Sequence, residues 1–293
     1  MAKSKKKKPS VKKTTTKKTT VTTVTTTTTE VDKSLDTHYL LVLDRSGSMQ
    51  GCWNSTIEGL NEQLGTIRGL EEKYPEQRYF ITLVAFDSEI ETIIEDKSIS
   101  EVDNFDGTEF PPRGMTSLHD AMGVSVSDLK IRLDKKNKES DSISTALVVI
   151  MTDGGENHSK EYRGQDGKDR LKKMIDGLEE TGAWTFSFMG ANQDAVLTAG
   201  GFGIAAGNSV TYASTARGAS AAYTTLDSAI SNRANANSRA YTASLLDSGK
   251  VGLTTFSNLS ANRDAFMSEV VEGDEIGEDT SNLKEDKSSE DKA

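Results

Sequence analysis

Cysteine is nearly missing from this chain of 293 residues, and that scarcity excludes several kinds of site. Cys52 is the only cysteine, so an intrachain disulfide, a cysteine-based zinc site and an iron–sulfur cluster are ruled out. No run approaches 18 consecutive apolar residues, which excludes a membrane-spanning helix. The first residues are rich in Lys with no apolar stretch behind them, unlike a secretory signal. We therefore expect a cytoplasmic protein.

Apolar residues make up only 34% of the chain, and the charge is distributed unevenly. Residues 1–29 contain nine Lys and no acid, whereas residues 269–293 contain ten acids and three Lys. Both ends have little to bury, so we predict that they are disordered. The body between them is acidic, which argues against extensive nucleic-acid binding and leaves only weak contacts through residues 1–29.

Apolar strands and amphipathic helices alternate through the middle of the sequence. Continuous apolar runs predict buried strands, helical spacing predicts helices between them, and a hairpin is expected at a sheet edge. The expected strands are 39–43, 79–86, 90–94, 146–151, 184–189 and 209–212, and the expected helices lie around 57–70, 118–133, 171–178 and 223–230. This alternation predicts an α/β, doubly wound, mostly parallel sheet with one antiparallel edge strand.

The same patterns divide the chain into four segments. Residues 1–35 form the predicted Lys/Thr-rich disordered arm, and residues 36–234 form the α/β domain. Residues 235–268 are rich in Ala, Asn and Ser and are interpreted as a helical extension of that domain. Residues 269–293 form the predicted acidic disordered tail.

Oxygen-bearing side chains follow the two most apolar strands. Asp44, Ser46 and Ser48 come after the first strand, Asp153 comes after the strand at 146–151, and Thr116 precedes the helix between them. Ligands of open parallel sheets bind where the carboxyl ends of the strands meet, so these side chains are expected to converge. Hard oxygen donors favour Mg²⁺, with Mn²⁺ as the alternative, over zinc.

These five residues resemble the metal-ion-dependent adhesion site (MIDAS) of the von Willebrand factor A (VWA) domain. The family pattern is Asp-x-Ser-x-Ser, then a Thr, then an Asp after a buried strand, and Asp44, Ser46, Ser48, Thr116 and Asp153 fill it in order. The resemblance covers residues 36–234 and implies a VWA, Rossmann-like fold. It also implies that both serines, and Thr in the ligand-engaged state, bind the metal directly, while the two acids act largely through water.

The resemblance further implies a function in binding rather than catalysis. In the family, a carboxylate of a partner protein completes the coordination of the metal. The expected partner is thus another protein that presents an acidic residue, and an AAA+ ATPase is one candidate, because small intracellular members of the family often work with such enzymes. We expect the acids to be exposed at the strand ends, so that Asp44→Ala would abolish metal binding without unfolding the domain.

Other interpretations stay open at this point. The serines and Thr116 could simply cap helices, and Trp53 either lines a docking face or packs internally. A metal-dependent hydrolase or phosphotransferase could use the same pocket, with His119 or His158 as a base. A nucleic-acid- or virion-associated structural protein could act through its Lys-rich arm. However, the second Asp of haloacid-dehalogenase-type phosphatases is replaced here by Ser46, and no G-x-S-x-G motif surrounds Ser48.

Overall fold

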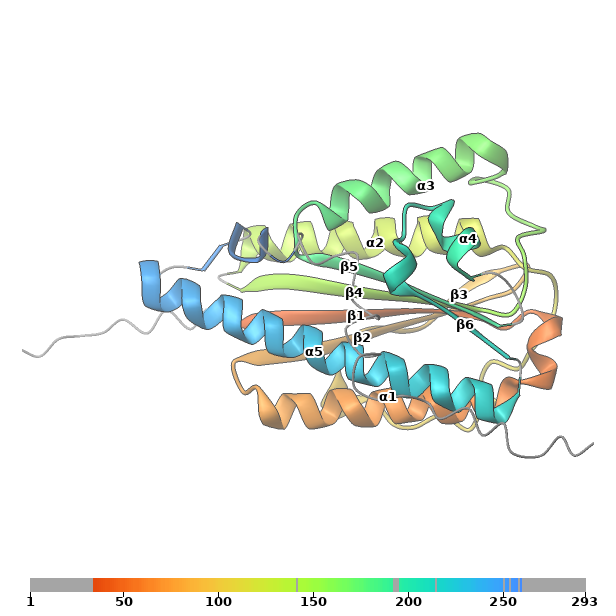
Figure 1. Cartoon of the computed structure of the whole chain (residues 1–293), viewed down its shortest axis with the longest axis horizontal. Helices are drawn as coiled ribbons and strands as arrows, with labels where there is room; N and C mark the ends of the chain where they lie inside the picture. Colours follow the sequence, from red (N-terminus) through yellow and green to blue (C-terminus); the bar gives the residue numbers. More distant parts are fainter. Residues whose placement is uncertain are drawn as a thin grey trace, which may run out of the picture. The chain divides into compact units, whose positions relative to one another are not determined.

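A single sheet organises the described part of the chain (Figure 1). The computed structural model describes residues 34–259, except 141, 192–194, 214, 250, 253 and 258. Within this part, six strands lie in the order β3-β2-β1-β4-β5-β6. All neighbours run parallel except β3, which pairs antiparallel with β2. The predicted α/β, doubly wound, mostly parallel sheet with one antiparallel edge strand is confirmed.

The central strands are buried along their whole length. They are β1 (Leu35–Asp44), β4 (Ile143–Thr152) and β5 (Trp184–Ala191), and their apolar runs reflect helices on both faces. The flanking strands are β2 (Gln77–Phe86), β3 (Ile90–Ser98) and β6 (Ser209–Tyr212). β1 begins four residues earlier than the apolar run predicts, because the polar residues Asp36, Thr37 and His38 are also buried within the sheet.

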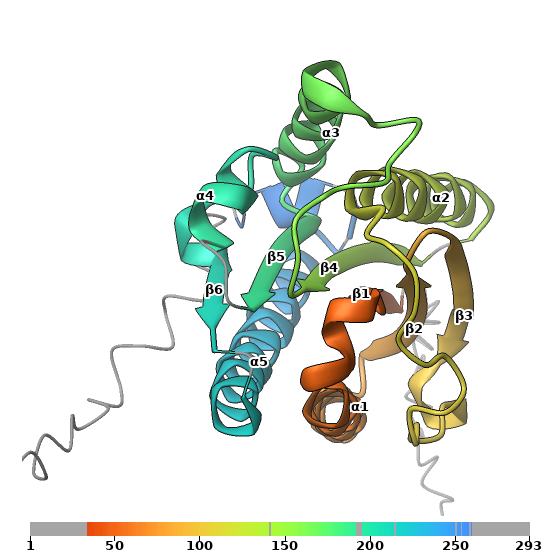
Figure 2. The same cartoon turned by 90° about the vertical axis from the view of Figure 1, so that its right-hand side faces the viewer.

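Helices cover the two faces of the sheet as separate groups (Figures 1 and 2). On one face, α1 (Trp53–Lys73) and α5 (Ala216–Ser248) pack against side chains such as Leu41 and Leu43. On the other face, α2 (Leu118–Glu139), α3 (Gly164–Glu179) and α4 (Ala195–Gly200) pack against Leu40 and Val42. Short 3₁₀ helices include η1 (Gly47–Gly51), η2 (Ile99–Glu101) and η3 (Ala206–Asn208). No helix in the described ranges is long and apolar enough to cross a membrane.

Helix α5 continues without interruption past residue 234, where the sequence becomes rich in Ala, Asn and Ser. Its second half is attached to the sheet by polar contacts. Gln77 Nε2 donates to Ala234 O at 2.8 Å, and Asn237 Nδ2 donates to Thr145 Oγ1 at 3.2 Å. This polar attachment explains why the apolar spacing of the segment is weak. The predicted arm and acidic tail lie outside the described residues, apart from the short stretch that starts β1.

The packing of α1 against α5 generates a testable prediction at Gly59. A Cβ at this position would lie 2.0 Å from the ring of the buried Tyr223, whereas nothing lies within 4 Å of a Cβ at the exposed Gly65 of the same helix. We expect Gly59→Ala to lower the free energy of unfolding by about 1–3 kcal/mol through overpacking. Gly65→Ala should raise it by about 0.5–1 kcal/mol through helix propensity. Urea denaturation of both variants measures the difference, and equal effects would contradict the close contact.

Candidate metal centre

The predicted ligands lie at the carboxyl edge of the sheet, which Figure 2 views end-on. β1 ends at Asp44 and leads directly into η1, while the adjacent parallel strand β4 ends at Thr152. After β1, the next two strands in sequence, β2 and β3, lie on one side of it. The later strands β4, β5 and β6 lie on its other side. This reversal of strand order next to β1 is the position where open α/β sheets bind ligands.

Four of the five predicted residues form one hydrogen-bonded cluster. The Ser46 backbone N–H donates to Asp44 Oδ1 at 2.7 Å. The hydroxyl oxygens of Ser46 and Ser48 are 3.1 Å apart, and Ser48 Oγ donates to Asp153 Oδ1 at 2.7 Å. Asp44, Arg45 and Ser46 are buried, Asp153 is half-buried, and Ser48 is exposed. The cluster therefore extends from the interior of the domain to its surface.

Thr116, the fifth predicted residue, reaches the same place from a different loop. A Cβ added at Gly154 would lie 3.6 Å from Ser48 Oγ and 3.7 Å from Thr116 Oγ1, so both hydroxyls border the same small space. Asn157 Oδ1 accepts from the Thr116 backbone N–H at 2.9 Å, which fixes this loop to the one that follows β4. The structure thus brings together all five residues that the motif identifies.

Burial raises the pKa of both acids of the cluster. It raises the pKa of Asp44 to about 6, against the lowering effect of hydrogen bonds from Thr152 and Ser46, and the charge of Asp153 adds to the increase. Burial also raises the pKa of Asp153, although the bond from Ser48 opposes this. The expectation that both acids are exposed is wrong for Asp44, which is 0% exposed. Its carboxylate is shielded from water because Asp44 is the last residue of β1, a strand that is buried along its whole length.

The donor set fits a hard dication. It consists of carboxylate and hydroxyl oxygens, which Mg²⁺ and Mn²⁺ prefer. Neighbouring ligands of an octahedral Mg²⁺ are about 2.9 Å apart, given metal–oxygen distances near 2.0–2.1 Å, and the Ser46 and Ser48 oxygens are separated by 3.1 Å. Among the described residues, no three or more His, Cys, Asp or Glu side chains gather into a metal site. A dication at the cluster would therefore rely on hydroxyl oxygens as well as on its two acids.

Sequence reasoning missed an ion-pair network that surrounds the cluster. Arg45 lies between two predicted ligands and is buried, and its Nε donates to Asp87 Oδ2 at 3.0 Å. Arg113 Nε donates to the same oxygen at 2.8 Å. Burial alone would raise the pKa of Asp87, but hydrogen bonds from Arg113 and the Glu89 N–H and the charge of Arg45 hold it below its usual range. The only sequence signal was that Asp87 follows a strand, which is also typical of a hairpin turn.

The structure shows the surroundings of Trp53 and His119, two residues for which the sequence allowed more than one role. Trp53 is buried, donates from Nε1 to Gly107 O at 3.1 Å and packs edge-on against Phe110. It is therefore a packing residue and not part of an exposed docking face. His119 is also buried, with Nδ1 3.1 Å from Tyr162 O, and burial lowers its pKa.

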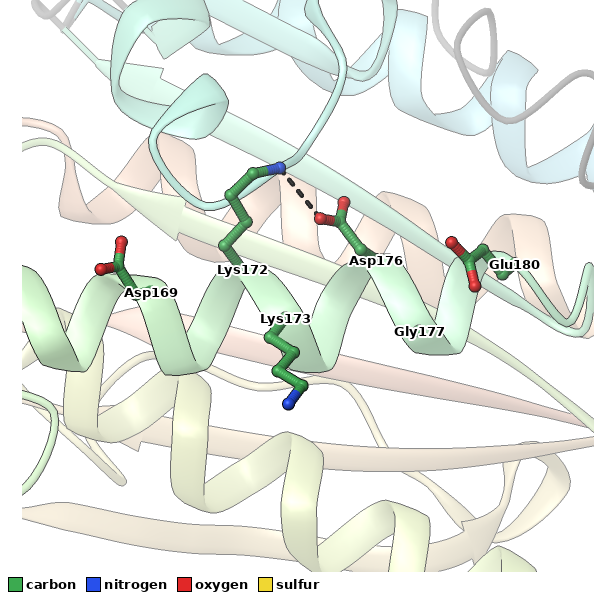
Figure 3. Close-up of a pocket in the computed structure, with 6 residues that line it drawn as sticks. All are labelled: Asp169, Lys172, Lys173, Asp176, Gly177 and Glu180. Atoms are coloured by element: carbon green, nitrogen blue, oxygen red, sulfur yellow. Dashed lines mark hydrogen bonds and ion pairs between the residues drawn. The ribbon is translucent and has the colours of Figure 1, made fainter.

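A separate groove lies along α3 and contains none of the predicted ligands (Figure 3). Its lining includes both positively and negatively charged side chains, and Lys172 Nζ pairs with Asp176 Oδ2 at 2.9 Å. Its lining residues come from this helix and the residue that directly follows it: Asp169, Lys172, Lys173, Asp176, Gly177 and Glu180. Because no other loop contributes a polar group, the groove lacks the convergence seen at the carboxyl edge of the sheet.

Comparisons with known proteins give similarity of fold and no more. No family model and no curated protein matches the chain. One similar solved structure is proximal thread matrix protein 1 from the mussel byssus, with 12% identity, a TM-score of 0.43, and coverage of 65% of this chain and 47% of that chain. Another is the manganese-loaded TRAP protein of Plasmodium vivax, with 18% identity, a TM-score of 0.40, and coverage of 62% and 69%.

A third is a von Willebrand factor type A structure from Catenulispora acidiphila, with 11% identity, a TM-score of 0.44, and coverage of 66% of this chain and 42% of that one. The matched region thus spans less than half of the mussel and Catenulispora chains. A further structure of the mussel protein has a zinc-occupied MIDAS motif. At these identities and scores the likeness supports no conclusion about activity, and the assignment of a site depends on the residues at the carboxyl edge of the sheet.

Proposed function

We propose that this protein is a metal-dependent protein-interaction module. Asp44, Ser46, Ser48, Thr116 and Asp153 would hold Mg²⁺, with Mn²⁺ as the alternative, and the ion would bind a carboxylate of a partner protein. The observation that carries the proposal is the hydrogen-bonded cluster that joins Asp44, Ser46, Ser48 and Asp153 at the carboxyl edge of the sheet. The partner is identified only by its acidic residue, an AAA+ ATPase being one candidate, and the proposed location is the cytoplasm.

The proposed ligands have different roles in the interior of the domain and at its surface. The buried Asp44 supplies a negative charge and fixes the loop through the Ser46 N–H. The hydroxyls of Ser46, Ser48 and Thr116 are neutral donors, so they bind a dication without cancelling its charge. Ser48 is exposed and Asp153 is half-buried, which leaves the surface side of the centre accessible to an incoming carboxylate. A bound dication supplies an electrophilic attachment point for that carboxylate.

We propose binding rather than catalysis because, within the described part of the chain, neither serine of the cluster contacts a histidine that could act as a general base. The neighbouring His119 is buried, and its Nδ1 lies 3.1 Å from a backbone carbonyl oxygen. The Ser46 and Ser48 hydroxyls contact each other and Asp153 rather than a histidine. A serine nucleophile would need an adjacent base oriented by a third group.

The assigned site predicts how a single substitution at Asp44 changes metal binding. We expect Asp44→Asn to weaken Mn²⁺ binding by more than about tenfold, since it removes the buried charge that the ion would offset. The matched control is Asp36→Asn, because Asp36 is equally buried on the same strand but lies at its opposite end. Mn²⁺ binding followed by electron paramagnetic resonance, with melting curves to confirm folding, measures both variants. Equal Mn²⁺ affinity in Asp44→Asn and wild type would contradict the assigned site.

The metal affinity should also depend on pH. Burial raises the pKa of Asp44 to about 6, so the metal-free site takes up a proton between neutral and mildly acidic pH, and that proton competes with the dication. We expect Mn²⁺ affinity to fall by about fourfold or more between pH 7.5 and pH 5.5, from the titration of this one group. Isothermal titration calorimetry at the two pH values measures the change. A constant affinity would show that Asp44 stays ionised throughout.

The partner should be captured only when the metal site is intact. A pull-down with wild type and Asp44→Asn, each in Mg²⁺ and in EDTA, is expected to retain a partner on wild type with Mg²⁺ alone. Partners that are independent of both the metal and Asp44 would contradict metal-bridged docking. Turnover of a phosphoester or peptide panel that is lost in Asp44→Asn would instead support the hydrolase alternative.

A further inference from the structure

An ion-pair network with a buried Arg45–Asp87 pair at its core adjoins the loops of the candidate metal centre. The Arg45 and Asp87 side chains are each only 3% exposed, and Asp87 Oδ2 accepts from both Arg45 Nε and Arg113 Nε. Arg45 also pairs through Nη1 with Glu91 Oε2 at 2.8 Å. The buried Arg45–Asp87 pair is a strong geometric restraint, because breaking a buried ion pair is costly. Arg113 adds a second guanidinium to the same carboxylate from a more exposed position.

The backbone around Asp87 connects the same loops. Arg45 N–H donates to Phe86 O at 2.8 Å, and Arg113 N–H donates to Arg45 O at 2.7 Å. The Ser117 N–H, directly after Thr116, donates to Asp87 O at 3.0 Å. The segment after β2 therefore contacts the residue between Asp44 and Ser46 on one side and the residue after Thr116 on the other.

We propose that Asp87 is a positioning residue of the metal centre, which acts through Arg45 and Arg113 to hold the loop of Asp44, Ser46 and Ser48 against the loop of Thr116. The inference rests on the proposed function, since it concerns the affinity of that site for a dication. Asp87 is not a ligand in this scheme. It determines how well the hydroxyl oxygens from two separate loops are arranged before the ion arrives.

Asp87 also has an electrostatic role. Arg45 places a positive charge next to Asp44 in sequence, and a bare guanidinium there would repel a dication. The shared carboxylate of Asp87, together with Glu91, offsets that charge. Removal of the Asp87 charge would therefore weaken metal binding in two ways, by releasing the two loops and by exposing the dication to Arg45.

The chain supplies a closely matched control at the other end of β1. Asp36 is 0% exposed and also binds two cations, with Oδ1 2.7 Å from Arg78 Nη2 and Oδ2 2.9 Å from Lys136 Nζ. Asp36→Asn and Asp87→Asn thus remove the same kind of buried carboxylate from between two cations. Only Asp87 is connected to the loops of the candidate metal centre.

The experiment measures Mn²⁺ affinity by electron paramagnetic resonance and melting temperature for wild type, Asp87→Asn, Asp87→Glu and Asp36→Asn, with affinity determined well below the melting temperature of each. We expect both Asn variants to melt at lower temperature. Only Asp87→Asn should bind Mn²⁺ about 10- to 100-fold more weakly, the usual effect of removing a residue that orients metal ligands. Asp87→Glu should recover part of the affinity because it restores the charge.

Arg45→Gln separates positioning from charge alone. It removes a positive charge near the ion, so a purely electrostatic effect would tighten Mn²⁺ binding, whereas loss of the link between the loops should weaken it. Tighter binding by Arg45→Gln, or equal losses of affinity in Asp87→Asn and Asp36→Asn, would overturn the positioning role. Wild-type affinity in Asp87→Asn would overturn it while leaving the proposed function intact. Absence of Mn²⁺ binding by wild type would overturn both.

Discussion

The burial of the Asp44 carboxylate at the end of β1 is the constraint on which the candidate metal centre depends. β1 lies at the middle of the sheet and is covered on both faces, so its last residue is withdrawn from water even though the chain turns there. The carboxylate accepts from the Ser46 N–H and from Thr152 Oγ1 on the adjacent strand. These bonds fix the direction in which the loop leaves the strand, and they thereby determine where Ser46 and Ser48 lie.

The two ends of β1 show what is unusual about Asp44. Asp36 is as deeply buried, but Arg78 and Lys136 neutralise its charge. Asp44 has only neutral donors, and its pKa is raised to about 6. A buried carboxylate without a cationic partner is costly unless it becomes protonated or gains a cation. The lack of a protein cation at Asp44, within the described part of the chain, is therefore the property that suits it to an external dication.

The sequence predicts the sheet well because its buried strands consist largely of apolar residues, which appear as continuous runs. The runs at 39–43 and 146–151 identify β1 and β4, and the motif places Asp44, Ser46, Ser48 and Asp153 at their ends and Thr116 just before α2. What sequence patterns could not reveal were polar residues that are buried by partners distant in the chain. Asp36 belongs to β1 because two cations compensate it, and the second half of α5 belongs to the domain through side chains such as Asn237. Neither of these contacts produces a periodic pattern of residues that could be recognised in the sequence.

Arg45 is a second case in which the partner of a buried charged residue is distant in the chain. A cation next to Asp44 in sequence could have neutralised it, as Lys136 does for Asp36. Instead, the Arg45 guanidinium pairs with Asp87 and Glu91, while the Asp44 carboxylate keeps its neutral donors. The Arg45 guanidinium is thus occupied by Asp87 and Glu91 and does not act as the counter-charge of Asp44. The ion pair of Arg45 with Asp87 and the uncompensated carboxylate of Asp44 are therefore two parts of one electrostatic arrangement.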